Sequence, residues 1–348
     1  MDQALPLLEV KDLRMRFPLR RGWFGRPRSW CLAVDGIDFE LSRGETLGLV
    51  GESGCGKSTT ARAVAQLHRP SSGVVRLKGR DLTRLAGQAL IAARKDMQMV
   101  FQDPYASLDP RMTAGDVIAE PLRIYNTRGI LHLSRRDLED RVEELMERVG
   151  LSRTFKNRFP HQFSGGQRQR IGIARALALQ PELVLCDEPV SALDVSIQAQ
   201  ILNLFKDLQQ ALGLTYLFIA HDLAVVEYVA SRVAVMYLGT LVELSESAEL
   251  YRNPLHPYTQ ALLSAAPIPD PRVEKGRQRI ILSGDVPAPD PVRAGCPFYD
   301  RCWMRMDRCR EHTPRLREAA PGHKVACFLY HDPDQALAFF TGLSTENL

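Results

Sequence analysis

A glycine-rich loop between an apolar run and a helix-forming run constrains this chain more than any other feature of its sequence. Residues 51–58 fit the pattern G-x-x-x-x-G-K-[ST] and follow residues 46–50, which have the composition of a buried strand. Residues 59–65 favour a helix. Glycine lets a backbone wrap a phosphate group, and a helix N-terminus supplies free N–H groups and positive potential. The sequence therefore predicts a strand, a phosphate-binding loop and a helix in an α/β fold.

Two side chains of this loop suit the β- and γ-phosphates of a nucleoside triphosphate and the Mg²⁺ that accompanies them. Lys57 can reach the β- and γ-phosphates, and the hydroxyl of Ser58 can ligate Mg²⁺. We predict that contacts with the bound nucleoside triphosphate come from Gly51, Ser53, Gly54, Cys55, Gly56, Lys57, Ser58 and Thr59.

A second anion-binding device lies about a hundred residues further along the chain. Ser164, Gly165, Gly166 and Gln167 precede the helix-like run 168–179. A hydroxyl, free amides and the helix dipole then point in one direction, which favours phosphate binding. The chain therefore carries two predicted anion sites.

The order of these segments, with Gln102, Asp187, Glu188 and His221 between and after them, resembles that of the ATP-binding cassette (ABC) ATPases over roughly residues 7–250. The resemblance implies an α/β P-loop NTPase fold with a RecA-like core lobe, an antiparallel β lobe and a helical subdomain at about 103–165. It also implies a head-to-tail dimer in which residues 164–167 of one subunit complete the ATP site of the other.

By the same resemblance, four residues surround the γ-phosphate. Asp187 ends the strand 183–187 near Mg²⁺, and Glu188 is the general base for the attacking water. Gln102 senses Mg²⁺ and the γ-phosphate, and His221 contacts the γ-phosphate. Because no member of the set is missing, we expect a site competent for hydrolysis rather than a non-hydrolysing regulatory subunit.

Two further residues carry roles implied by the family. Asp194 belongs to a loop, residues 191–194, that crosses the dimer seam. Phe17 corresponds to the aromatic residue that stacks on adenine, with Trp23, Phe24 and Trp30 as nearby competitors. A basic, glycine-containing loop is expected at residues 20–28.

The chain after residue 250 has a different character. The segment 253–259, Asn-Pro-Leu-His-Pro-Tyr-Thr, resembles the C-terminal extension of oligopeptide and dipeptide importer ATPases. The expected division is a nucleotide-binding domain at 7–250 and an irregular extension at 251–348, with proline-rich stretches at 267–271 and 287–291.

That resemblance also implies the partners of the chain. They are a second, paralogous ABC ATPase subunit, two transmembrane permease subunits and, indirectly, an extracytoplasmic peptide-binding protein. The implied location is the cytoplasmic face of the plasma membrane. Nickel or another small solute, imported by the same kind of machine, remains an alternative cargo.

Composition agrees with such a role. The net charge of +4, from 45 basic and 41 acidic residues, is too weak to indicate nucleic acid binding. No apolar run approaches the roughly 18 residues of a membrane span, and the N-terminus lacks the features of a signal peptide, so a cytosolic chain is expected. A soluble ABC ATPase of DNA repair or translation is the alternative, but this chain has no long heptad run.

Four of the seven cysteines fall near the C-terminus, at Cys296, Cys302, Cys309 and Cys327. In a cytosolic chain such a group indicates metal ligation rather than disulfides. Zinc sites usually contain closer cysteine pairs, and a 4Fe–4S cluster also takes four cysteines. Because similar tails of related ATPases are associated with such a cluster, we expect 4Fe–4S with a structural or redox-sensing role. Zinc and unmetallated thiols remain alternatives.

Overall fold

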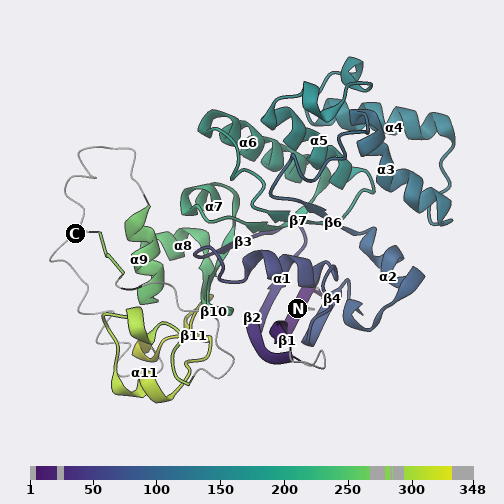
Figure 1. Cartoon of the computed structure of the whole chain (residues 1–348). Helices are drawn as coiled ribbons and strands as arrows, with labels where there is room; N and C mark the ends of the chain where they lie inside the picture. The colour runs from purple at the N-terminus through teal and green to yellow at the C-terminus, as the bar shows by residue number, and fades with distance from the viewer. Residues whose placement is uncertain (1–4, 22–26, 267–278, 283, 285–293, 331–348) are drawn as a thin grey trace.

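The computed structural model describes residues 5–21, 27–266, 279–282, 284 and 294–330 (Figure 1). The proline-rich stretches expected at 267–271 and 287–291 lie outside these residues. The helices are α1 Lys57–Val64, α2 Gly87–Arg94, α3 Ala114–Thr127, α4 Arg135–Arg148, α5 Gly165–Leu177, α6 Val195–Leu212, α7 Leu223–Val229, α8 Ser247–Arg252, α9 Pro257–Ala265 and α11 Asp307–Glu311. The strands are β1 Leu8–Arg21, β2 Pro27–Leu41, β3 Thr46–Val50, β4 Ser72–Leu77, β5 Arg80–Asp81, β6 Met97–Val100, β7 Leu183–Asp187, β8 Thr215–Ile219, β9 Arg232–Tyr237, β10 Thr240–Glu246, β11 Arg317–Ala320 and β12 His323–Val325.

The strands form two sheets. The larger has the order β11-β12-β10-β9-β3-β8-β7-β6, and β3 runs parallel to both of its neighbours. Every residue of β3, β7 and β8 is buried. A parallel sheet covered on both faces requires such continuous apolar strands, which is why residues 46–50 and 183–187 show no alternation with polar residues.

Alternate residues of these central strands enter two different cores. Cys186 and Phe218 belong to the core shared with α3–α6, whereas Leu185 and Leu217 belong to the core shared with α1 and β1. Figure 1 shows α3, α4, α5 and α6 on one side of the large sheet and β1, β2 and β4 on the other.

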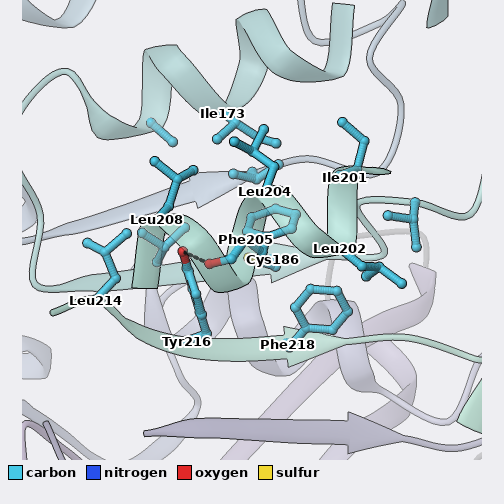
Figure 2. Close-up of a cluster of buried hydrophobic side chains, with 14 of the residues drawn as sticks. Ile173, Cys186, Ile201, Leu202, Leu204, Phe205, Leu208, Leu214, Tyr216 and Phe218 are labelled. Carbon is cyan, nitrogen blue, oxygen red and sulfur yellow. Dashed lines mark hydrogen bonds between the residues drawn. The ribbon is translucent and has the colours of Figure 1, made fainter. Parts of the chain in front are cut away.

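Helix α6 links the sheet to α5 through aromatic packing (Figure 2). The ring of Phe205 meets Tyr216 and Phe218 edge-on, at centroid distances of 5.5 and 5.7 Å. The Tyr216 hydroxyl donates a hydrogen bond of 3.1 Å to the Phe205 carbonyl oxygen, and Ile173 of α5 packs in the same cluster. This packing joins α6 to strand β8 and to α5.

The smaller sheet has the order β2-β1-β4-β5 and its pairs are antiparallel. The β1–β2 hairpin extends further than expected. Arg20 pairs with Ser29, so the strands continue into the basic segment that the sequence suggested was a loop at 20–28. Backbone pairing maintains the strands there through register shifts, although apolar alternation has ended.

The C-terminal part of the described chain extends the large sheet. Strands β11 and β12 form a hairpin, and β12 pairs with β10. This hairpin lies within the extension that was expected to be irregular, and its strands of four and three residues are too short to show an alternating pattern in the sequence. No helix in the described part of the chain is long and apolar enough to cross a membrane.

One buried carboxylate anchors this part of the chain to β10. Glu243 accepts hydrogen bonds from the backbone N–H groups of Leu255 and His256, at 2.7 and 2.9 Å, and contacts His323 Nε2 at 2.7 Å. Glu243 and His323 are almost fully buried. Since a buried charge is costly without partners, this arrangement fixes the start of α9 and the β12 strand against β10.

Candidate nucleotide site

The phosphate-loop motif opens onto a cavity of about 480 Å³. Its walls come from the loop and α1, the β2 strand, and the segments that follow β6, β7 and β8. The lining residues are Cys31, Ala33, Ser53, Gly54, Gly56, Lys57, Ser58, Thr59, Gln102, Glu188 and His221. The structure therefore brings nine of the eighteen predicted nucleotide-site residues around one space.

The loop has the backbone that a phosphate cradle requires. Gly56, the N-cap of α1, has φ of 110°, and a Cβ atom there would lie 2.2 Å from the Ala33 carbonyl oxygen. No side chain caps α1, so its first amides are available to an anion. Lys57 is 4% exposed and donates to the carbonyl oxygens of Gly51 and Glu52 at 2.7 and 3.0 Å.

A hydroxyl and a carboxylate meet beside α1. Ser58 Oγ donates a hydrogen bond of 2.6 Å to Asp187 Oδ1. Asp187 Oδ2 is buried and makes no hydrogen bond within the described residues, although Arg62 lies 3.7 Å away. Burial raises the pKa of Asp187, opposed by the Ser58 hydrogen bond and by Arg62. An oxygen pair with one unsatisfied acceptor suits Mg²⁺, which prefers carboxylate and hydroxyl ligands.

Glu188 lies at the centre of a second polar group. Gln102 Nε2 donates to Glu188 Oε2 at 2.8 Å, and His221 Nδ1 lies 3.3 Å from the same oxygen. Glu188 has φ of 47°, an uncommon value for a residue with a side chain, and such backbone strain gathers at functional sites. The carboxylate is therefore directed into the cavity by its backbone and by both neighbours.

The predicted second anion site lies apart from this cavity. Ser164 is the N-cap of α5, where its Oγ accepts from the Gln167 N–H at 3.3 Å and Gln167 Oε1 accepts from the Ser164 N–H at 3.0 Å. Ser164 is exposed, as is Asp194 at the N-cap of α6. Gly166 is buried, and a Cβ atom there would lie 2.5 Å from Ile197 Cγ2, so glycine allows α5 and α6 to approach each other.

Two predicted contacts, Phe17 and Cys55, do not line the cavity. Phe17 is half-buried on β1 and meets His68 edge-on at 5.9 Å, so its role in adenine stacking stays a prediction. Cys55 is 2% exposed and belongs to the core beneath the loop. Burial raises the pKa of its thiol. Sequence reasoning assigned no role to Cys31 and Ala33, which line the cavity from β2 and carry no motif.

The C-terminal part of the chain reaches the phosphate loop directly. The Tyr258 hydroxyl accepts a hydrogen bond of 2.8 Å from the Glu52 N–H. Arg301 forms two bonds with the Glu52 carboxylate, at 2.7 and 3.0 Å. Sequence reasoning missed both residues as neighbours of the nucleotide site. Tyr258 lies in the recognised segment 253–259, but nothing in the sequence pairs it with Glu52.

The four C-terminal cysteines line one small cavity of about 10 Å³. Burial, together with a smaller effect of the other three cysteines, raises the pKa of Cys327 to about 12. Burial also raises the pKa of Cys302. Among residues 5–21, 27–266, 279–282, 284 and 294–330, no three His, Cys, Asp or Glu side chains gather as the ligands of a single metal ion.

Comparisons with known proteins agree with this geometry. The ABC transporter family matches residues 34–191, and the C-terminal region of oligopeptide/dipeptide transporters matches residues 242–309. The oligopeptide transport ATP-binding protein AppF of Bacillus subtilis is 52% identical over 93% of this chain and 97% of its own length. The oligopeptide transport ATP-binding protein OppF of Salmonella typhimurium is 52% identical over 94% of this chain and 97% of its own length.

A solved structure gives the same fold. The ATP-binding cassette MJ0796, a dimer in a post-hydrolysis state bound to ADP and Pi, superimposes with a TM-score of 0.60 and 29% identity. The match covers 69% of this chain and 98% of that one, which confirms the predicted ABC ATPase fold. This chain belongs to the oligopeptide transport ATP-binding proteins of the ABC transporter family.

Proposed function

We propose that this chain is the ATP-hydrolysing subunit of an importer for oligopeptides or dipeptides at the cytoplasmic face of the plasma membrane. The observation that carries the proposal is the contact between the nucleotide site and the C-terminal segment. Residues of the phosphate loop line one cavity with Gln102, Glu188 and His221, and the segment related to peptide transporters bonds to the phosphate loop of that site. We place the division between these parts near residue 250.

The arrangement of Glu188 suits a general base in ATP hydrolysis. Its Oε2 receives the Gln102 amide and faces His221, so both neighbours orient the carboxylate toward the cavity. Phosphoryl transfer to water depends mainly on positioning and charge stabilisation. Mg²⁺, held by Ser58, Asp187 and Gln102, would supply positive charge to the phosphates. Lys57 binds the phosphates once it exchanges its loop carbonyl partners for them.

The exposed ends of α5 and α6 are the proposed contacts with a second ATPase subunit. Ser164 and Asp194 are exposed, and Val195 beside them is an apolar side chain that is 81% exposed. In such a dimer, residues 164–167 of one subunit complete the ATP site of the other. The proposed partner is a paralogous subunit.

An open groove beside Gln102 is the proposed contact with the permease subunits. It has a volume of about 320 Å³ and includes Phe101, Ile124 and Leu67, which are 36%, 45% and 49% exposed. A groove with exposed apolar side chains next to the γ-phosphate sensor can pass closure of the site to a bound helix. The partner that binds a peptide outside the membrane acts only through these permeases.

The four C-terminal cysteines are proposed to hold a 4Fe–4S cluster, with zinc as the alternative. Four thiols around one cavity are a suitable donor set, and each cysteine of such a cluster binds its own iron rather than one shared ion. The cavity of about 10 Å³ is smaller than a cluster, so the side chains have to move outward to accommodate it.

Purification of the native complex tests the proposal. The chain, tagged and isolated from its own membranes without air, should bring with it two multi-span subunits and a second cassette ATPase, with about four irons per chain. The complex in proteoliposomes should release phosphate faster when peptide is supplied. Stimulation by nickel instead of peptide would support the alternative cargo. Recovery without membrane partners would favour the soluble ATPase, and zinc without iron would exclude the cluster.

A further inference from the structure

The segment between Cys296 and Cys302 touches the phosphate loop through the buried side chain of Arg301. Arg301 ends a short turn, Tyr299–Arg301, and is directly followed by Cys302. Its side chain is 8% exposed, and both terminal nitrogens bond to the Glu52 carboxylate, at 2.7 and 3.0 Å. A bidentate arginine–carboxylate pair fixes orientation as well as distance. The direction of Glu52 therefore depends on the cysteine-bearing segment.

A second contact acts on the backbone of the same residue. The Glu52 N–H donates to the Tyr258 hydroxyl at 2.8 Å. Tyr258 is fully buried and packs against Tyr237 and Phe298, with ring centroids 4.6 and 5.5 Å apart. Phe298 lies between Cys296 and Arg301 in sequence, so the tyrosine and the arginine are held by one apolar cluster.

Glu52 in turn contacts the side chain that meets the nucleotide. Lys57 Nζ donates to the Glu52 carbonyl oxygen at 3.0 Å and to the Gly51 carbonyl oxygen at 2.7 Å. Thus the backbone N–H, the carboxylate and the carbonyl of one loop residue are each engaged, two of them by the C-terminal segment. A displacement of Glu52 would move the carbonyl groups that position Lys57.

We propose that Arg301 and Tyr258 are positioning residues for ATP binding, through which the four-cysteine segment sets the conformation of the phosphate loop. The inference rests on the proposed function of the site. It adds that the state of the cysteine segment regulates nucleotide affinity: the loop keeps its binding conformation while that segment is folded against it. Neither residue touches the reacting atoms, so both act through Glu52.

The test measures binding of a fluorescent ATP analogue to the purified full chain, with ATP KM and kcat in the assembled complex. Arg301→Gln should weaken binding about tenfold, which corresponds to about 1.4 kcal/mol, and raise KM while kcat changes little. Arg301→Lys keeps the charge but not the bidentate geometry, so it should recover part of the affinity. Arg310→Gln, on the exposed side of α11 in the same segment, is the matched control and should bind as the wild type does.

Two further variants separate positioning from other effects. Glu52→Gln with Arg301→Gln removes both charges. If Arg301 acts by positioning Glu52, the double variant should still bind the ATP analogue weakly. Full recovery of the affinity would assign the loss to the unneutralised Glu52 charge and overturn the proposal. Tyr258→Phe removes one hydroxyl from a packed ring, so it should fold even if Arg301→Gln does not. It should weaken binding about threefold, because one hydrogen bond is lost.

The link to the cysteines has its own test. Cys302→Ser should weaken binding of the ATP analogue, and it should add nothing when combined with Arg301→Gln, because the two changes interrupt the same connection. Additive losses, or no effect of Cys302→Ser, would contradict the link. A wild-type chain that binds no ATP would overturn the proposed function as well. Normal binding by Arg301→Gln and Tyr258→Phe in a chain that binds ATP would overturn this inference alone.

Discussion

The two helix N-termini that the sequence marks as anion sites, at α1 and α5, are built differently. Helix α1 begins at Gly56 without a side-chain cap and faces a cavity shared with a buried lysine, Lys57. Helix α5 begins at Ser164 with a complete capping box, in which Gln167 and Ser164 satisfy each other. The first end leaves its amides to a ligand, and the second satisfies part of its own hydrogen bonding.

This difference shows what a single chain can do alone. The α1 end, with Asp187 and Glu188, has the groups for binding the triphosphate and for activating water. The α5 end is exposed and outside that cavity, so a ligand there needs another surface to enclose it. We therefore infer that ATP binds first at α1 and that the α5 end contributes only after a partner subunit arrives.

The largest expected effect is a loss of ATP hydrolysis without a loss of ATP binding at the α1 site. Glu188→Gln should lower kcat of the assembled complex by about 10²- to 10⁴-fold, because the general base is lost, while ATP affinity stays close to that of the wild type. Phosphate release and analogue binding, measured on the same preparation, check this. Asp109→Asn, on an exposed loop where the carboxylate pairs with Arg111, is a control that should keep full turnover. Normal turnover of Glu188→Gln would refute its role.

Alanine substitutions at two glycines of α5 should change the free energy of unfolding in opposite directions. Gly166→Ala should lower the free energy of unfolding by about 1–3 kcal/mol, because the new Cβ would lie 2.5 Å from Ile197 Cγ2. Gly172→Ala, six residues further on the same helix, meets no atom within 4 Å and should raise it by about 0.5–1 kcal/mol. Urea denaturation of the two variants and the wild type measures these changes in the free energy of unfolding. Equal effects would show that α5 and α6 are not packed as described.

Acidification should loosen the anchor behind the α1 loop. Burial lowers the pKa of His256 to about 4 against the opposing effect of Glu243, and its Nδ1 accepts the Tyr258 N–H. The unfolded chain binds this proton near pH 6.5, the folded chain only near pH 4. The free energy of unfolding should therefore fall by up to about 3 kcal/mol between pH 6.5 and 4, and this contribution is constant above pH 6.5.

The control for this pH effect is His256→Asn, which keeps an acceptor for the N-cap but cannot titrate. Its unfolding free energy, measured by urea denaturation across the same pH range, should lose this part of the slope. Glu243 and His323, which face the same site, are present in both proteins, so their contributions cancel in the comparison. An unchanged slope would contradict the role of His256 in the pH dependence.

The smallest effect concerns two thiols near the α1 loop. Cys31 lines the cavity from β2, whereas Cys55 is buried under the loop, and burial raises the pKa of both. A maleimide should label Cys31 several-fold faster, and ATP with Mg²⁺ should slow that labelling. Mass spectrometry of timed samples measures it, with Cys31→Ser as control. Faster labelling of Cys55 would mean that the loop opens more than the structure shows.

The sequence predicted the α1 side well because local rules determine it. The buried strand β3, the loop and α1 follow from apolar composition, glycine and lysine spacing within about twenty residues. The meeting of Gln102, Glu188 and His221 was implied only by resemblance, since they come from three separate segments. The structure places them in contact.

The contacts of the C-terminal part were beyond sequence reasoning. Tyr258 and Arg301 lie 206 and 249 positions from Glu52, and no motif records a pairing over such distances. The β11–β12 hairpin was missed because its strands carry no alternating pattern of apolar residues. Sequence patterns report local structure and buried faces, but a single ion pair between distant segments leaves no pattern.

One binding experiment tests the central comparison most directly. The affinity of the purified full chain for a fluorescent ATP analogue is measured for Lys57→Met and for Ser164→Ala. Because α1 holds the site of the single chain, Lys57→Met should weaken binding about 10- to 100-fold, as expected for lost hydrogen bonds to a charged group. Ser164→Ala should leave the affinity of the single chain unchanged. Equal losses in the two variants would contradict the account.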